Sequence, residues 1–170
     1  MRIAITMLFC AFAAACGRDA SGSPAGLRGG APSVRELGAA VVTALAAGDT
    51  AALQAMRTTE QEHNELLWPH FPIAKQDTTG ATRGFAWENI QLRNGAAAGE
   101  WTASFRGRQV RFDDARCTGQ VEEYGPFQIL RECSVTVTDV ARGRAFELRP
   151  FDRVVRMNGV HKVIRYVEVD

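Results

Sequence analysis

Several features that would point to a familiar class of function are missing from this sequence. Its 170 residues carry a formal net charge of +1, so no overall field attracts nucleic acid or an anionic surface. The chain has three histidines and four cysteines without a Cys-x-x-Cys spacing, which is a poor ligand set for zinc. The HExxH, GxSxG, GxGxxG and phosphate-loop motifs are also missing. We therefore expect no metal, no cofactor and no catalytic residue.

A long hydrophobic run is missing too. The uncharged stretch from Ile3 to Ala15 follows Arg2 and is shorter than the about 20 residues of a transmembrane helix. This arrangement is typical of a secretory signal peptide, here residues 1–15. The sequence therefore predicts export.

Two kinds of processing fit the end of this signal. Ala13 to Cys16 resembles the lipobox of bacterial lipoproteins, a resemblance that implies lipidation of Cys16 and a lipid anchor in a membrane. Gly17 after the cysteine implies, within that family, sorting to the outer membrane on the periplasmic side of the cell envelope. Ala13 and Ala15 also match the pattern of ordinary signal cleavage, so plain secretion with a free thiol is the alternative.

Residues 16–32 are rich in Gly, Ser, Ala and Pro and bury too little apolar surface to fold, so we expect a flexible tether. Residues 33–170 then form a single domain. Its two cysteines, Cys117 and Cys133, form a disulfide in an oxidising compartment. A hairpin centred near Gly125 would place them opposite each other, whereas a rival turn at Gly119 would need a bulge.

Helical signals fill the first part of the domain. Ser33 and Glu36 form a capping box, and apolar residues recur every four positions until Gly48. Asp49 caps a second short helix, and a third starts at Thr58 or Thr59 and runs to Trp68, where Pro69 and Pro72 end it. After a loop over 77–84, residues 85–105 are expected to be helical with a break near Gly95.

From Arg108 onward the apolar residues alternate, which predicts strands. Four strands are expected. The first covers 108–112, one long strand covers 127–138, a third covers 146–155 after Arg142-Gly143, and the last covers 160–169. Asn158-Gly159 is a strong hairpin signal, because both central residues of a type I′ turn need positive φ. Helices followed by an antiparallel meander predict the α+β class, with the helices packed on a curved sheet of about four strands.

Two segments carry a further resemblance. ALAAGDTAALQAM (44–56) and RVVRMNGVHKVIRYV (153–167) resemble the NTF2-like, cystatin-like-cone superfamily, and the whole chain resembles small uncharacterised bacterial lipoproteins. The superfamily resemblance implies a cone-shaped pocket between helices and sheet. In some members such a pocket binds small apolar ligands or performs proton-transfer chemistry, and other members are interaction modules.

The candidate pocket residues are aromatic or apolar, with one arginine among them: Trp68, Trp87, Phe127, Ile129, Arg131 and Phe151. Arg131 shares a strand face with apolar residues, and a buried arginine needs an anionic partner, either Asp152 or Glu147 or the carboxylate of a ligand. Simple exposure, on a face that is not the core, is the other interpretation. Large aromatic residues at the spacing of Trp68 and Trp87 are usually core residues.

Other chemistry-bearing residues have simpler interpretations. His63, His70 and His161 are interpreted as exposed polar residues, and Asp139 and Asp152 as turn residues or arginine partners. Arginines at 83, 93, 106, 108 and 111 are interspersed with tryptophan and phenylalanine, a pattern that we interpret as a solvated helix face rather than a nucleic-acid site.

The sequence thus predicts an envelope protein that acts as a small-ligand-binding or interaction module, with an apolar or anionic ligand. An enzyme that uses the same pocket for proton-transfer or hydrolytic chemistry is the alternative, and a protein–protein adaptor is a third. Convergent ionisable groups in the pocket would favour the enzyme. A contiguous apolar patch on the exposed sheet face would favour the adaptor and a protein partner.

Overall fold

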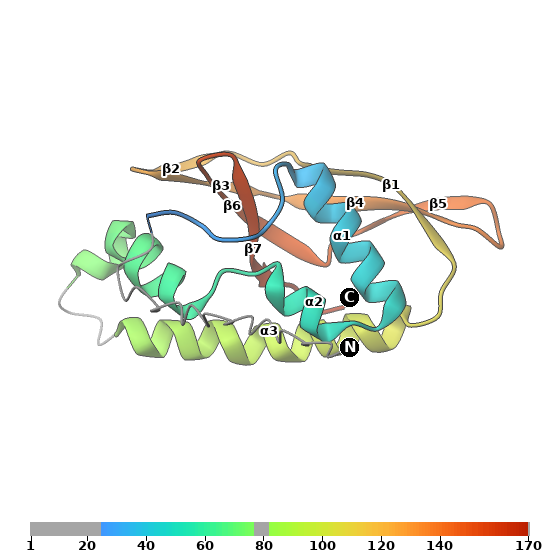
Figure 1. The fold of residues 1–170 in the computed structure, drawn as a ribbon, viewed down its shortest axis with the longest axis horizontal. Helices are drawn as coiled ribbons and strands as arrows, with labels where there is room; N and C mark the ends of the chain where they lie inside the picture. Colours follow the sequence, from blue (N-terminus) through green and yellow to red (C-terminus); the bar gives the residue numbers. More distant parts are fainter. Residues whose placement is uncertain (1–24, 77–81, 170) are drawn as a thin grey trace, which may run out of the picture.

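A computed structural model describes residues 25–76 and 82–169 of the chain. The expected signal peptide, Cys16 and the first part of the tether lie outside the described residues. Helices come first along the chain and strands follow, and Figure 1 shows α3 along one side of the molecule with α1 between it and the strands. The α+β class is therefore confirmed.

The first two helices begin and end as their caps predict. In α1 (Val34–Ala47) the Ser33 hydroxyl accepts the Glu36 N–H at 3.1 Å and donates to the Glu36 carboxylate at 2.9 Å. The helix ends at Gly48, where φ is +71°. Asp49 accepts the Ala52 N–H at 2.9 Å and caps α2 (Thr50–Ala55). Local side-chain hydrogen bonds therefore fix both helices.

The expected third helix is replaced by a chain of tighter and wider turns. A π-helical turn, η1 (Glu62–Leu67), is followed by the 3₁₀ turns η2 (Trp68–His70) and η3 (Pro72–Lys75). Thr59 and Glu62 form the capping box, since each side chain accepts the other's N–H, at 3.2 and 2.7 Å. The two prolines lie in first turns, where no N–H is needed.

Helix α3 (Arg83–Phe105) runs without interruption, so the predicted break near Gly95 is wrong. The neighbouring Asn94 explains the difference, because its side chain is buried and satisfies the backbone of β7. Its Oδ1 accepts the Tyr166 N–H at 2.6 Å, and Trp101 donates to the Val167 carbonyl at 2.6 Å. Tertiary hydrogen bonds thus hold an Asn-Gly pair in a helix.

Within residues 25–76 and 82–169, seven strands form two antiparallel sheets, instead of one sheet of about four. The first sheet has the order β1-β4-β5, and the second has the order β2-β3-β6-β7. Their bounds are β1 (Val110–Cys117), β2 (Glu122–Tyr124), β3 (Phe127–Arg131), β4 (Cys133–Asp139), β5 (Arg144–Leu148), β6 (Phe151–Met157) and β7 (Val160–Tyr166).

Short breaks divide two of the expected strands. Glu132 has φ +54° and separates β3 from β4, so the chain passes there from one sheet to the other. Both faces of β3 are covered, because Ile129 belongs to one apolar cluster and Leu130, on the opposite face and 7% exposed, belongs to the other. Similarly, Pro150 lies between β5 and β6, which belong to different sheets.

The turns and the disulfide agree with the prediction. Gly125 and Pro126 connect β2 to β3, and Asn158-Gly159 connects β6 to β7, with φ of +50° and +77°. Cys117 lies directly opposite Cys133 in the β1–β4 register, and the two form a disulfide. The hairpin around Gly125 therefore prevails over a turn at Gly119.

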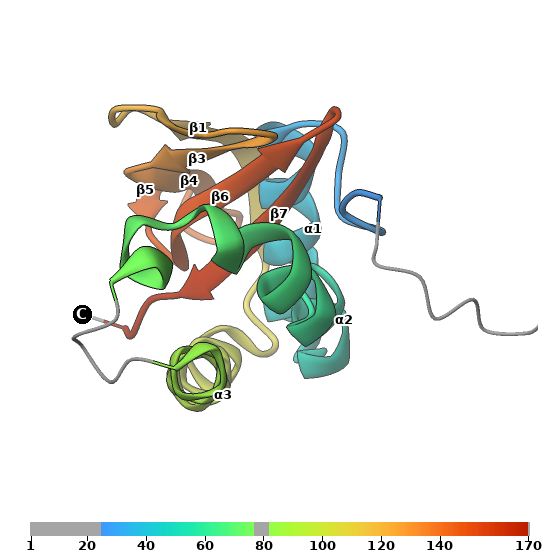
Figure 2. The ribbon, with the colours of Figure 1, turned by 90° about the vertical axis from the view of Figure 1, so that its left-hand side faces the viewer.

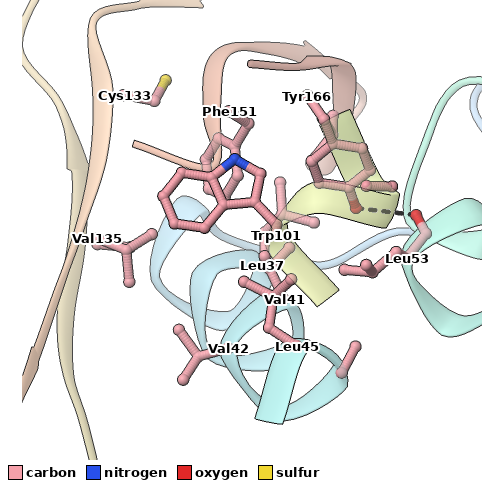
Figure 3. Close-up of a cluster of buried hydrophobic side chains, with 14 of the residues drawn as sticks. Leu37, Val41, Val42, Leu45, Leu53, Trp101, Cys133, Val135, Phe151 and Tyr166 are labelled. Carbon is pink, nitrogen blue, oxygen red and sulfur yellow. Dashed lines mark hydrogen bonds between the residues drawn. The ribbon is translucent and has the colours of Figure 1, made fainter. Parts of the chain in front are cut away.

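Two apolar clusters hold these elements together. Figure 3 shows the main core, in which α1 side chains such as Leu37 and Leu45 meet Trp101, Val135 and Phe151. There the Tyr166 hydroxyl donates to the Leu53 carbonyl at 2.8 Å. The smaller cluster comprises Leu27, Leu67, Phe127, Ile129, Val155 and Met157. The turns η1–η3 cover this second cluster through residues such as Leu67 and Phe71.

The last residues of the expected tether are packed on the domain. Leu27 is 8% exposed, and Ala31 exchanges two backbone hydrogen bonds with His161 on β7, at 3.0 and 2.8 Å. The Lys162 ammonium donates to the Arg28 carbonyl at 2.9 Å and to Glu62 at 2.8 Å. Ordered structure thus begins before Ser33, because a buried ion pair captures this segment.

Candidate functional site

A cavity of about 570 Å³ lies between the turns η1–η3, the first part of α3 and the second sheet. Figure 2 shows η1–η3 in green, between the strands and α3. The apolar lining residues come from all three sources: Leu67, Trp68, Phe71, Pro72, Ile73, Ala86, Ile90, Tyr124, Ile129 and Ile164. Polar lining is contributed by His63, Gln76, Glu122, Arg153 and Arg165. The cavity is therefore apolar with a few charged groups.

His63 lies in the cavity wall and packs against one tryptophan from the turns and one from α3. It is 3% exposed, and its ring centroid lies 5.8 Å from that of Trp68 and 5.3 Å from that of Trp87. Its Nδ1 lies 2.9 Å from the Asn64 side-chain oxygen. Burial lowers the pKa of His63 below its ordinary value, despite the opposing effect of Asn64. The imidazole is therefore neutral at pH 7.

Glu122 on β2 is held by two hydrogen bonds. The Arg131 guanidinium donates to one carboxylate oxygen, and the Tyr124 hydroxyl donates to the other at 3.1 Å. Burial alone would raise the pKa of Glu122, but these hydrogen bonds hold it below its ordinary value. Burial and the neighbouring Glu122 carboxylate raise the pKa of Tyr124. Glu122 is therefore a carboxylate, and Tyr124 a neutral phenol, at neutral pH.

Asp152 lies beside two arginines of the cavity wall. Its Oδ2 is 3.6 Å from Nε of Arg153 and 3.7 Å from Nη2 of Arg165. These distances are longer than a hydrogen bond. Asp152 Oδ1 and Arg153 Nε are buried, and neither has a hydrogen-bond partner. This ion cluster is only loosely paired.

The structure brings two of the six candidate pocket residues into the cavity wall, Trp68 and Ile129. Phe127 is buried beneath it in the second cluster, and Trp87 packs against His63. Phe151 belongs to the main core. Arg131 pairs with Glu122, so neither expected partner, Asp152 or Glu147, forms its salt bridge. The β2–β3 hairpin brings Glu122 beside Arg131, and alternation along one strand does not identify a partner on a neighbouring strand.

The histidine interpretations need a similar correction. His70 is exposed as expected, but His63 and His161 are 3% and 8% exposed. His63 lies under aromatic rings, and His161 is covered where Ala31 pairs with β7. The five arginines at 83, 93, 106, 108 and 111 are exposed as expected, while Trp87, Trp101 and Phe105 are buried. They do not share one helix face, because Arg83 and Arg93 lie on α3, Arg106 and Arg108 follow its end, and Arg111 lies on β1.

Sequence reasoning missed Phe71, Tyr124, Ile90, Arg153 and Arg165 as cavity residues. Phe71 follows Pro69 in irregular chain, where no periodicity places a side chain. Arg153 and Arg165 look like the polar face of a strand, and only the pairing of β6 with β7 brings them together. The one signal available was the excess of arginine in the last strands.

The comparisons with known proteins add no identification. No protein-family model, curated protein or solved structure matches this chain. Within residues 25–76 and 82–169, no helix has the length and apolar character needed to cross a membrane. Over the same residues, no three His, Cys, Asp or Glu side chains come together as a metal site.

Proposed function

We propose that this protein is an exported, lipid-anchored domain of the cell envelope that binds a small molecule in the cavity beside η1–η3. The cavity carries this proposal. Its volume of about 570 Å³ falls within the about 300–1,000 Å³ of typical ligand sites, which are mostly apolar with a few placed polar groups. Export and the anchor rest on the signal-like residues 1–15 and the lipobox resemblance at Cys16.

We also propose an NTF2-like arrangement for the domain. Three observations support it: helices that precede an antiparallel sheet, a Gly-Asp junction between α1 and α2, and a cavity between helical turns and strands. The division into two sheets at Glu132 differs from the single curved sheet of a cone.

The pairing of Glu122 with Tyr124 and Arg131 supports binding over catalysis by these groups. A general acid must be able to donate a proton to the substrate, and a general base must be able to accept one from it. Glu122 and Tyr124 instead bond to each other, and Arg131 holds the same carboxylate. This is an arrangement of fixed charges in an apolar wall.

The exposed apolar residues support binding over a sheet-face adaptor. Among the described residues, the large exposed apolar side chains are Ile73, Phe85, Leu92, Val121, Val140 and Val169. They belong to η3, to α3 and to segments beside strands, so they do not form one patch on a sheet face.

Fluorescence of N-phenyl-1-naphthylamine, a neutral probe that brightens in apolar sites, tests the cavity. The protein is the full chain with Cys16→Ser, exported to a bacterial periplasm and purified without detergent, so that no micelle competes for the probe. We expect saturable binding at one site. Ala86→Phe, which fills the cavity from α3, should abolish it, whereas Ala96→Phe at an exposed position of the same helix should not. Absence of saturable binding, or equal loss in both variants, would contradict the proposal.

The intact mass of the unaltered protein extracted from membranes tests the anchor. We expect a chain that begins at Cys16 and carries three acyl groups, and a Cys16→Ser variant that leaves the membrane fraction. A chain that begins at Cys16 without acyl mass would reject the anchor and leave secretion in its place.

A further inference from the structure

Three arginines form a row across the second sheet, next to the cavity. In the strand register Arg131 of β3 pairs with Arg153 of β6, and Arg153 pairs with Arg165 of β7. Like charges directly opposite each other on neighbouring strands destabilise a sheet. Negative charge nearby therefore stabilises the row, whose side chains are 40%, 42% and 33% exposed at Arg131, Arg153 and Arg165.

Two carboxylates supply this negative charge only in part. Glu122 is bound to Arg131 at one end of the row, and Asp152 lies more than 3.5 Å from both other guanidinium groups. With three arginines and two carboxylates, the cluster keeps one positive charge. Nε of Arg153 is buried without an acceptor, which costs free energy unless another acceptor neutralises the site. The charge excess is thus centred on Arg153 and Arg165.

A backbone irregularity places these side chains at the cavity. The β6–β7 register shifts on both sides of Arg153, and such bulges re-aim side chains, commonly beside functional sites. Arg153 and Arg165 both line the cavity, whose remaining wall includes Trp68, Phe71 and Ile90. One end of an apolar cavity therefore carries unbalanced positive charge.

We propose that the ligand is a monoanionic amphiphile. Its oxyacid group, a carboxylate or sulfonate, lies against Arg153 and Arg165, and its apolar body fills the space between η1–η3 and α3. A single negative charge neutralises the excess of the row, and the guanidinium group is suited to bind an oxyacid with two parallel hydrogen bonds. This inference rests on the proposed binding function and specifies its ligand class.

A pair of matched probes tests it. 8-Anilinonaphthalene-1-sulfonate has the skeleton of N-phenyl-1-naphthylamine with one added sulfonate. Using the same Cys16→Ser protein, we expect the anionic probe to bind at least tenfold more tightly than the neutral one. Arg153→Gln and Arg165→Gln should each lower the affinity for the anionic probe about tenfold, since hydrogen bonds to charged groups have this magnitude, and leave the affinity for the neutral probe within twofold.

Arg156→Gln is the control variant, because Arg156 is also on β6, bonds to Gln128, and lies outside the cavity wall. It should leave both affinities unchanged. Neutral-probe binding also reports that each variant is folded. If the neutral probe binds and the anionic probe shows no preference, or if Arg156→Gln matches Arg153→Gln, the ligand class is wrong while the binding function stands. If neither probe binds, the binding function itself is wrong.

Competition separates the two oxyacids. Decanoate should displace the anionic probe at a concentration at least tenfold below that of 1-decanol, and decanesulfonate serves as the second acid. A carboxylate preference assigns a carboxylic ligand, and a sulfonate preference assigns a sulfonic ligand. Equal displacement by the alcohol and both acids would overturn the inference.

Discussion

Gly95 and Gly38 are both helical glycines, yet their surroundings differ. A Cβ at Gly95 would meet nothing within 4 Å, whereas a Cβ at Gly38 would lie 2.3 Å from the Ala115 Cβ across the α1–β1 contact. We expect Gly95→Ala to raise the free energy of unfolding by about 1 kcal/mol through helix propensity. Gly38→Ala should lower it by about 1–3 kcal/mol through overpacking.

Urea unfolding followed by circular dichroism measures both variants. A Gly95→Ala protein less stable than the parent would mean that the backbone at Gly95 departs from the helix described here.

His63 makes stability depend on pH. Burial, with Arg83 as a smaller contribution and Asn64 and Glu60 opposing it, keeps its native pKa below the ordinary value. The unfolded chain therefore binds more protons than the native one below about pH 6.5. Stability should fall as the pH drops through this range, and His63→Phe, which keeps a ring between the tryptophans, should flatten the dependence. Urea midpoints at pH 7.5 and 5.5 measure it, and an unchanged slope in His63→Phe would contradict this assignment.

The residues that sequence reasoning placed correctly owe their positions to local interactions. Ser33, Gly48, Asp49 and Asn158-Gly159 each act within a few residues of themselves. The Asn94-Gly95 break was wrong because a contact from β7, far along the chain, satisfies Asn94. Positions that depend on interactions within a few residues could be predicted from the sequence, whereas positions that depend on distant partners could not.

Among the elements, the β1–β4 pair is closed by a covalent bond. Cys117 and Cys133 are 16 residues apart, a loop for which the chain-entropy model gives about 3 kcal/mol. We expect the Cys117→Ser/Cys133→Ser double variant to lose about that much stability in urea. A reductant should shift the parent by a similar amount and leave the double variant unchanged. A shift in both proteins would mean that the reductant acts elsewhere.

The strands show why the candidate site was only partly predictable. A period of two assigns faces correctly as long as a strand is continuous, and it placed Ile129 and Val135 inside. At Glu132 and Pro150 the chain changes sheets. Residues before and after those points that alternation assigns to one face therefore pack against different parts of the protein. Phe151 was therefore expected at the pocket and lies in the main core, while Arg153 was overlooked.

For the molecule as a whole, the buried pair Glu62–Lys162 joins three distant parts of the chain. The side chains of Lys162 and Glu62 are 1% and 3% exposed, and Glu62 also accepts the N–H groups of Arg28 and Thr59 at 2.7 Å. Burial alone would raise the pKa of Glu62, but these partners hold it below its ordinary value. The N-terminal segment, η1 and β7 are thus fastened at one point.

We expect Glu62→Gln to lower stability by about 3–5 kcal/mol, because Lys162 then keeps a buried charge without a counter-charge. Amide hydrogen exchange should show the loss first at Ala31 and His161. Glu65→Gln, at an exposed position on the same turn, is the control and should stay within about 0.5 kcal/mol of the parent. Equal effects of the two variants would show that the ion pair does not hold the segment.

The contacts that hold the N-terminal segment on η1 and β7 also determine how the molecule responds to a pulling force. A pull on the N-terminal end enters the fold at residues 27–31, where it first strains the Ala31–His161 hydrogen bonds and the Lys162 contact with Arg28. Peeling this segment away removes Leu27 from the second cluster and exposes Glu62, next to His63 in the cavity wall. Ala31 packs at the edge of the main core, whose buried residues and the disulfide lie beyond that first rupture. Tension on the chain would therefore reach the cavity before it reaches the rest of the domain.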